Sequence, residues 1–137
     1  MPLALGFDYG LARIGVATGQ TLTQTASPLK AIKANDGIPN WDEVESLLNE
    51  WQPDIVIIGL PLNEDNSTSD MARRAQKFGQ RIHGRFGFQV EYVNEYYSTI
   101  EARECLNYNG KASGQDGKLD AVAASLILER WLGGHHA

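Results

Sequence analysis

The sequence predicts an α/β fold in which helices flank a mixed β-sheet of five strands. Residues 3–8 and 14–17 are apolar runs joined by Tyr9-Gly10, which is typical of a β-hairpin. Residues 54–59 form a continuous β-branched run, the pattern of a strand buried on both faces of a parallel sheet. Segments with helical periodicity precede and follow this run, and such alternation indicates one sheet covered by helices.

Two further strands complete the predicted sheet. Residues 27–32 predict a short third strand, which we expect near a sheet edge because Pro28 donates no backbone hydrogen bond. Residues 88–93 alternate between apolar and polar side chains and predict the fifth strand, which ends at Asn94-Glu95. Residues 60–69 are polar and unpatterned, so we expect a loop there.

The first helix has the clearest boundaries. Asn40 can cap it, Glu43 occupies the capping-box position, and Pro53 follows its end. Ser98 and Glu101 form a second capping box. Apolar spacing and these caps predict helices over residues 41–51, about 71–85, 98–106 and about 118–132.

Length and composition restrict the class of protein. A chain of 137 residues predicts a single domain, residues 1–137, with one packed core. The sequence has no run approaching the roughly 18 apolar residues of a membrane span and no signal peptide, so we expect a cytoplasmic protein without membrane contact. Cys105 is the only cysteine, which excludes an internal disulfide and a thiolate metal cluster.

Three carboxylates are candidates for a shared site. Asp8 ends one predicted strand, Glu95 follows another, and Asp120 lies in the first turn of the last predicted helix, so all three are expected at one sheet edge. Carboxylates that converge without basic partners repel one another unless a cation neutralises them, and all-oxygen ligation selects Mg²⁺ or Mn²⁺. Two such ions about 3.5–4 Å apart can activate water and stabilise the leaving oxygen in phosphodiester cleavage. Singly, each has a structural alternative: a turn residue, a surface carboxylate or a helix-dipole partner.

Phosphate contacts require local basic patches, because the net charge of the chain is −5. Arg73, Lys77, Arg81 and Arg85 recur every four residues on one predicted helix and form a basic stripe. The stripe predicts a nucleic-acid contact or, equally, a solvated helix face. Arg13 lies on the predicted hairpin near Asp8 and is a further candidate phosphate contact.

Several motifs together resemble the YqgF family, also called RuvX, over nearly the whole chain. An Asp-x-Gly opening alone is shared with sugar kinases and actin-like proteins, whereas the combination is specific. The motifs are Asp8-Tyr9-Gly10, residues 13–17, residues 56–62, residues 81–87, Glu95 with residues 98–102, and residues 118–121.

The resemblance implies a ribonuclease H-like fold and a metal-dependent nuclease that matures the 5′ end of pre-16S ribosomal RNA. It also implies that Asp8, Glu95 and Asp120 are the catalytic metal ligands, in agreement with the residue-level analysis. An older assignment for the family is a Holliday junction resolvase, which would need a dimer to cut two DNA strands. We expect a nucleic-acid partner, structured RNA ahead of branched DNA, and a monomer or weak homodimer.

The sequence departs from the family pattern beside Glu95. The family usually has Asp-Glu-Arg there, whereas this chain has Asn94-Glu95-Tyr96. Asn94 keeps an oxygen ligand without its charge, and Tyr96 removes a cation that could contact phosphate. A catalytically weak nucleic-acid-binding module therefore remains an alternative. A kinase-like nucleotide-binding module is disfavoured, because its two lobes need a longer chain.

Overall fold

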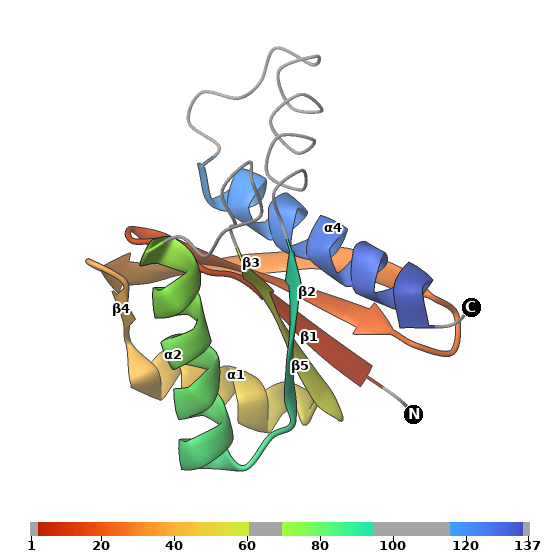
Figure 1. Ribbon diagram of the computed structural model, residues 1–137, viewed down its shortest axis with the longest axis horizontal. Coiled ribbons are helices and arrows are strands. Elements are labelled where there is room, and N and C mark those ends of the chain that lie inside the picture. The colour runs from red at the N-terminus through yellow and green to blue at the C-terminus, as the bar shows by residue number, and fades with distance from the viewer. Residues whose placement is uncertain (1–2, 61–69, 95–115, 136–137) are drawn as a thin grey trace.

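The computed structural model describes residues 3–60, 70–94 and 116–135, and these form one sheet with helices on both faces (Figure 1). Its strands are β1 (Leu3–Asp8), β2 (Arg13–Gln20), β3 (Thr25–Asn35), β4 (Ile38–Pro39), β5 (Ile55–Leu60) and β6 (Val90–Asn94). The helices described are α1 (Trp41–Trp51), α2 (Asp70–Phe86) and α4 (Asp116–His135).

The sheet is mixed, as predicted, with the strand order β4-β3-β2-β1-β5-β6. Strands β1 to β4 pair antiparallel, whereas β1, β5 and β6 run parallel to one another. The prediction of five strands was one too few. The additional strand β4 has only two residues, too few for a period-two pattern to be visible in the sequence. It pairs with β3 across Asp36-Gly37, whose positive φ angles of 51° and 83° are those that a type I′ hairpin turn requires.

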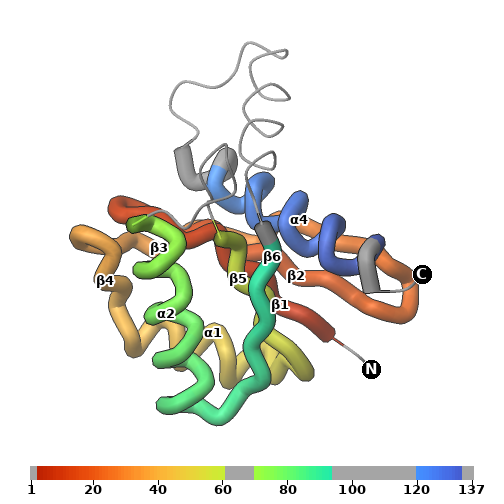
Figure 2. Tube along the Cα trace, viewed as in Figure 1, coloured from red at the N-terminus to blue at the C-terminus, as the bar shows by residue number. Residues whose placement is uncertain are grey.

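Parallel pairing puts the carboxyl ends of three strands at one edge of the sheet. Phe7 pairs with Ile58, and Leu60 pairs with Asn94, so β1, β5 and β6 end side by side. The tube in Figure 2 shows β6 next to β5 and α2. Ligands of such sheets bind beyond these carboxyl ends.

The core has two layers, because α1 and α2 cover one face of the sheet and α4 covers the other (Figure 1). In β1, Leu5 and Phe7 face α1 and α2, whereas Ala4 faces α4, as side chains that alternate along a strand must. Above the sheet, Leu128 of α4 packs over Gly6 and would lie 2.5 Å from a Cβ there. The small residues of β1 and β2 therefore allow α4 to approach the sheet closely.

The helix boundaries agree with the sequence in their main features. The Asn40 side chain accepts hydrogen bonds from the backbone of Asp42 and Glu43, at 2.9 and 3.4 Å, which confirms the predicted cap of α1. The last helix begins two residues before the predicted start and ends three residues after the predicted end. The predicted helix 98–106 and nearly all of the predicted loop 60–69 lie outside the described residues.

A membrane span requires a long apolar helix. None of the helices within residues 3–60, 70–94 and 116–135 is both long enough and apolar enough to cross a membrane.

Candidate active site

Asp8 is the last residue of β1 and lies at the carboxyl edge of the sheet. Because side chains alternate along the strand, Asp8 shares the α4 face with Ala4 and Gly6, opposite the face occupied by Phe7. Asp8 therefore lies on the same side of the sheet as α4. Asp8 is half-buried.

Gly15 brings Asp8 and Asp120 together. It is the cross-strand partner of Asp8 in the antiparallel pair of β1 and β2. A Cβ built on Gly15 would lie 1.9 Å from the Asp120 carbonyl oxygen and 3.0 Å from the Asp120 Cβ. The first described turns of α4 thus rest directly on the strand residue opposite Asp8. Only glycine permits this approach.

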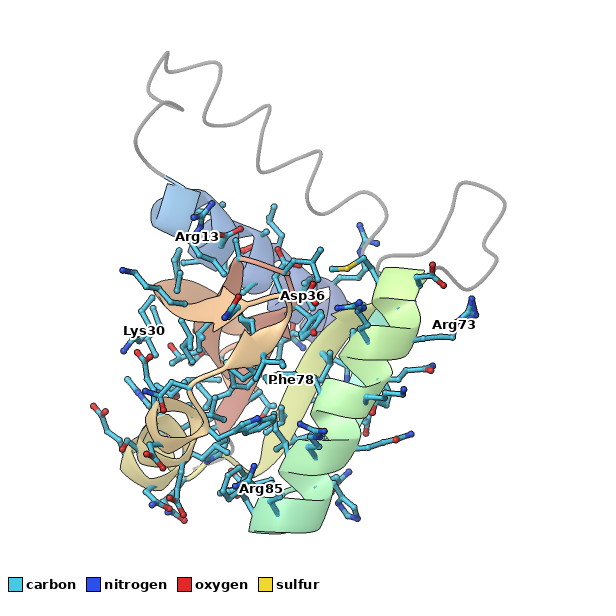
Figure 3. The ribbon with its side chains drawn as sticks, turned by 90° about the vertical axis from the view of Figure 1, so that its left-hand side faces the viewer. Arg13, Lys30, Asp36, Arg73, Phe78 and Arg85 are labelled. Carbon is cyan, nitrogen blue, oxygen red and sulfur yellow. The ribbon has the colours of Figure 1, made fainter. Side chains whose placement is uncertain are left out.

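Arg13 extends the same site. The Arg13 Nε donates a hydrogen bond to the Asp120 Oδ2 at 3.0 Å, and the two side chains are 39% and 27% exposed. Figure 3 shows Arg13 beside the start of α4. A partly exposed ion pair of this kind orients the carboxylate while its guanidinium stays accessible to a phosphate.

Glu95, the third predicted carboxylate, lies outside the described residues, as does Tyr96. It follows directly after Asn94, where β6 ends at the same edge as β1. Within the part of the chain that the structure describes, no three His, Cys, Asp or Glu side chains form a group that could hold a metal ion. Asp8 and Asp120 are two carboxylates at this edge, and carboxylate oxygens are the donors that Mg²⁺ and Mn²⁺ prefer.

The predicted basic stripe on α2 does not form one surface. Arg73 pairs with Asp70 at 3.0 Å and points away from the sheet (Figure 3). The Arg85 guanidinium lies over the Trp41 ring, 5.1 Å from its centroid. Lys77 and Arg81, between them along the helix, line a cavity. The stripe drifts around α2 because four residues exceed one helical turn of 3.6.

Comparison with known sequences places the chain in a family. The family described as "RuvX: Holliday junction resolvase" matches residues 3–134. The chain belongs to the YqgF/RuvX family. Relatives at high identity match over most of their length. A "Putative pre-16S rRNA nuclease" of Aeromonas salmonicida (strain A449) is 56% identical over 129 residues, covering 93% of this chain and 92% of the relative. A protein of the same name from Nitrosococcus oceani is 48% identical, covering 95% and 86%.

Solved structures show that this YqgF/RuvX chain has the ribonuclease H-like fold of the resolvases. RuvC of T. thermophilus, solved with a Holliday junction substrate, matches with a TM-score of 0.54 at 15% identity, covering 97% of both chains. The fowlpox virus Holliday junction resolvase matches with a TM-score of 0.56 at 20% identity, covering 96% of this chain and 99% of that one. At these identities the likeness concerns the fold alone.

Sequence analysis missed the positioning role of Gly15 in this YqgF/RuvX site. It included Gly15 in a family motif and gave the residue no function. The position of Gly15 in the hairpin was a signal that could have found it. In a hairpin whose turn is centred on residues 11 and 12, residue 15 pairs with Asp8. Asp8, Asp120 and Arg13 are the predicted site residues that the structure brings together.

Proposed function

We propose that this chain is a metal-dependent nuclease that hydrolyses phosphodiester bonds at the 5′ end of pre-16S ribosomal RNA in the cytoplasm. Membership of a nuclease family supports the reaction class, and the names of relatives at 48–56% identity support the RNA substrate. The observation that carries the proposal is the approach of Asp8 and Asp120 across Gly15. Two carboxylates held at one sheet edge are an arrangement that cation-assisted phosphoryl chemistry uses.

Asp8, Asp120 and Glu95 are the residues that would hold the metal. The Glu91 Oε1 accepts a hydrogen bond from the Trp131 Nε1 of α4 at 3.1 Å, and Val93 packs against the core beneath that helix, so the odd-numbered positions of β6 face α4. Glu95 is the next odd position along the chain. When bound, Mg²⁺ or Mn²⁺ supplies activation of water and neutralisation of the charge that develops on phosphate oxygens, which is chemistry of the two-metal type.

Arg13 has a positioning role in this proposal. Its hydrogen bond to the Asp120 Oδ2, at 3.0 Å, fixes the orientation of that carboxylate. The guanidinium also supplies the positive charge that a phosphodiester needs when it approaches two carboxylates. Arg13 therefore both fixes Asp120 and reduces the repulsion between the site and its anionic substrate.

The basic residues of α2 are the proposed contacts to the RNA backbone. Arg73, Lys77 and Arg81 are exposed, and Arg85 is exposed at the edge of an aromatic cluster. Phosphate contacts position a nucleic acid without reading its sequence, so these residues would bind RNA and DNA alike. Discrimination between the two must come from the shape of the substrate.

The direct test compares cleavage of a precursor rRNA fragment by the parent protein and by Asp8→Asn and Asp120→Asn, with Mg²⁺, Mn²⁺ or EDTA. Both substitutions keep the side-chain size and remove a charge that the metal requires, so we expect activity to fall by at least about 100-fold. Glu50→Gln is the control, because Glu50 is an exposed carboxylate on α1, on the opposite face of the sheet. Equal activity of all four proteins, or activity that persists in EDTA, contradicts the proposal.

Junction cleavage is the second candidate function, because the family description names a Holliday junction resolvase. A four-way DNA junction placed in the same assay distinguishes the two. Paired, symmetric incisions made by a dimer favour the resolvase, whereas trimming of the rRNA precursor alone favours the proposal above. Binding of either substrate without cleavage would instead favour the catalytically weak module.

A further inference from the structure

A cavity of about 240 Å³ lies on the face of the sheet opposite α4. Its walls come from four places in the chain: Tyr9 after β1, the β3–β4 turn with strand β4, Trp41 at the start of α1, and one side of α2. Its lining includes the polar or exposed side chains of Tyr9, Asp36, Ile38, Arg74, Lys77 and Arg81. No residue of this cavity belongs to the carboxylate site described above.

The α2 wall of the cavity is cationic. Arg74, Lys77 and Arg81 are spaced by three and four residues, which places them on one helix face. Asp36 pairs with Arg74 at 3.5 Å. Among the described residues, no carboxylate forms an ion pair with Lys77 or Arg81. Lys77 and Arg81, which have no ion-pair partner in the described part of the chain, therefore bring positive charge to one cavity of a chain whose net charge is −5.

On the opposite rim, directly after the Asp36-Gly37 turn, Ile38 presents an exposed apolar side chain. Ile38 is 61% exposed, although most large apolar residues of the described chain are buried. A cationic wall that faces an exposed apolar rim has the chemistry that one nucleotide needs: charge for the phosphate and an apolar surface for the base. The aromatic rings of Trp41 and Phe78, whose centroids are 5.5 Å apart, form the wall between them.

Hydrogen bonds hold the turn that carries this rim. The Tyr9 hydroxyl donates to the Gly37 carbonyl oxygen at 2.7 Å, and the Gly37 N–H donates to the Leu11 carbonyl oxygen at 2.9 Å. The Arg74 Nη1 donates to the Asp36 carbonyl oxygen at 3.2 Å. Because the turn is tied to both β1 and α2, the cavity exists before any ligand arrives, which lowers the entropic cost of binding.

We propose that this cavity binds a single unpaired nucleotide, with its phosphate on Lys77 and Arg81 and its base against Ile38. A volume of about 240 Å³ is below the roughly 300 Å³ at which sites for drug-sized ligands begin, so the cavity takes at most one nucleotide and excludes a duplex. The cavity would thus select substrates with a single-stranded segment.

The position of the cavity links it to the proposed nuclease site. Tyr9 follows Asp8 directly, and consecutive Cα atoms are about 3.8 Å apart, but the two side chains lie on opposite faces of the sheet. A strand that crosses the end of β1 would place one phosphate near Asp8 and another, a few nucleotides away, in the cavity. This second role rests on the proposed nuclease function, whereas mononucleotide binding does not.

The first experiment measures binding without cleavage. Uridine 5′-monophosphate, uridine and inorganic phosphate are titrated in EDTA into an Asp8→Asn protein, and backbone amide NMR signals are recorded. We expect the monophosphate to shift the amides of Gly37 and Ile38 and to leave Gly84, on the open surface of α2, unchanged. Uridine alone should shift them much less. A response to inorganic phosphate equal to that of the monophosphate would show an anion site without a base contact and would overturn the proposal.

The second experiment uses matched variants and a fluorescent single-stranded RNA octamer. Ile38→Glu places a negative charge on the rim and should weaken binding by at least about tenfold, whereas Leu22→Glu changes an apolar residue that is 70% exposed at the β2–β3 turn and should not. Arg81→Gln should reduce the slope of log K against log salt by about 0.7, the value for one phosphate contact with a single strand. Lys30→Gln, which removes a cation on β3 remote from α2 (Figure 3), should leave the slope unchanged.

The outcomes separate the two proposals. If Ile38→Glu and Leu22→Glu bind the octamer equally, or if duplex RNA competes as well as the octamer, the nucleotide cavity is rejected whatever the cleavage assays show. If the cavity variants lose binding while the parent protein cuts no substrate, the nuclease proposal fails and the cavity remains a nucleotide site.

Discussion

At the residue scale, the candidate site depends on a glycine rather than on its charged members alone. The Asp120 carbonyl oxygen occupies the space that a Cβ atom at position 15 would need. Asp8 is the cross-strand partner of Gly15. Any Cβ at this position must push α4 away from β2 or distort the strand. The distance between the two carboxylates is therefore sensitive to a residue that has no side chain and contributes no chemistry.

Gly15→Ala is expected to destabilise the protein by about 1–3 kcal/mol, the usual cost of overpacking, and to abolish cleavage. Gly84→Ala is the matched control, because no atom lies within 4 Å of a Cβ at Gly84. Gly84 is in α2, so its replacement should stabilise the protein by up to about 1 kcal/mol. Urea denaturation measures both. A Gly15→Ala protein as stable and active as the parent would show that α4 does not rest on β2 in solution.

The ionisation of Tyr9 makes the stability of the folded protein depend on pH. Burial raises the pKa of Tyr9 above its ordinary value of 10.0, and the neighbouring Arg74 and Arg81 oppose this increase only in part. The unfolded chain therefore loses its tyrosine proton at a lower pH than the folded chain. Stability from the neutral hydroxyl is complete below pH 10 and decreases as the pH rises toward the folded pKa.

Tyr9→Phe removes this dependence together with the hydrogen bond to Gly37. At pH 8 we expect the variant to be less stable than the parent by about 1 kcal/mol. Between pH 8 and pH 11 the difference should become smaller. Burial also raises the pKa of Tyr92, but Tyr92 is present in both proteins and its contribution cancels. Guanidinium denaturation at several pH values measures the difference, and a constant difference would contradict burial of the Tyr9 hydroxyl.

At the scale of elements, local sequence signals predicted where α1 begins and ends. The Asn40 side chain satisfies two backbone N–H groups of the first turn, and Gln52 ends the helix with a φ of 45° in the left-handed region. Both features depend on nearest neighbours in the chain, so they are visible without tertiary information. The direction of each basic side chain of α2 could not be predicted in this way, because it depends on which face of that helix meets the sheet.

Asn40→Ala should destabilise the protein by about 1 kcal/mol, because two N–H groups of α1 lose their acceptor. Asn40→Asp keeps an acceptor oxygen at the cap and adds a negative charge at the positive end of the helix, so it should retain the parent stability. The melting temperatures of the two variants provide the comparison. An equal loss in both would mean that the cap contributes through some other contact of Asn40.

At the scale of the whole molecule, two core layers hold the site between them. On one face, α4 packs through Leu128, which lies over Gly6 of β1 and Gly19 of β2. On the other face, Phe7 and Tyr9 contact Phe78 of α2, with ring centroids 5.5 Å apart in each pair. The end of β1 therefore presents Asp8 to one layer and Tyr9 to the other.

Leu128→Ala tests the α4 layer. Leu128 is fully buried, and its truncation should cost about 2–5 kcal/mol through lost burial and the cavity left behind. It should also reduce cleavage, because the helix that carries Asp120 would be held less firmly. Leu22→Ala, at an exposed turn, should change stability by less than about 0.5 kcal/mol. Similar losses in both variants, measured by urea denaturation, would contradict the described packing of α4.

The sequence by itself determined the α/β class, the alternation of strands with helices, the cap of α1 and the identity of Asp8, Arg13 and Asp120 as candidates. These follow from period, caps and strand ends, which are local properties of the chain. Tertiary structure decided which side chains meet: the contact of Arg13 with Asp120 joins residues 107 positions apart, and the role of Gly15 exists only because α4 lies on β2. It also added β4 and assigned Lys77 and Arg81 to a cavity. Such juxtapositions depend on packing between elements distant in the chain, which no local pattern contains.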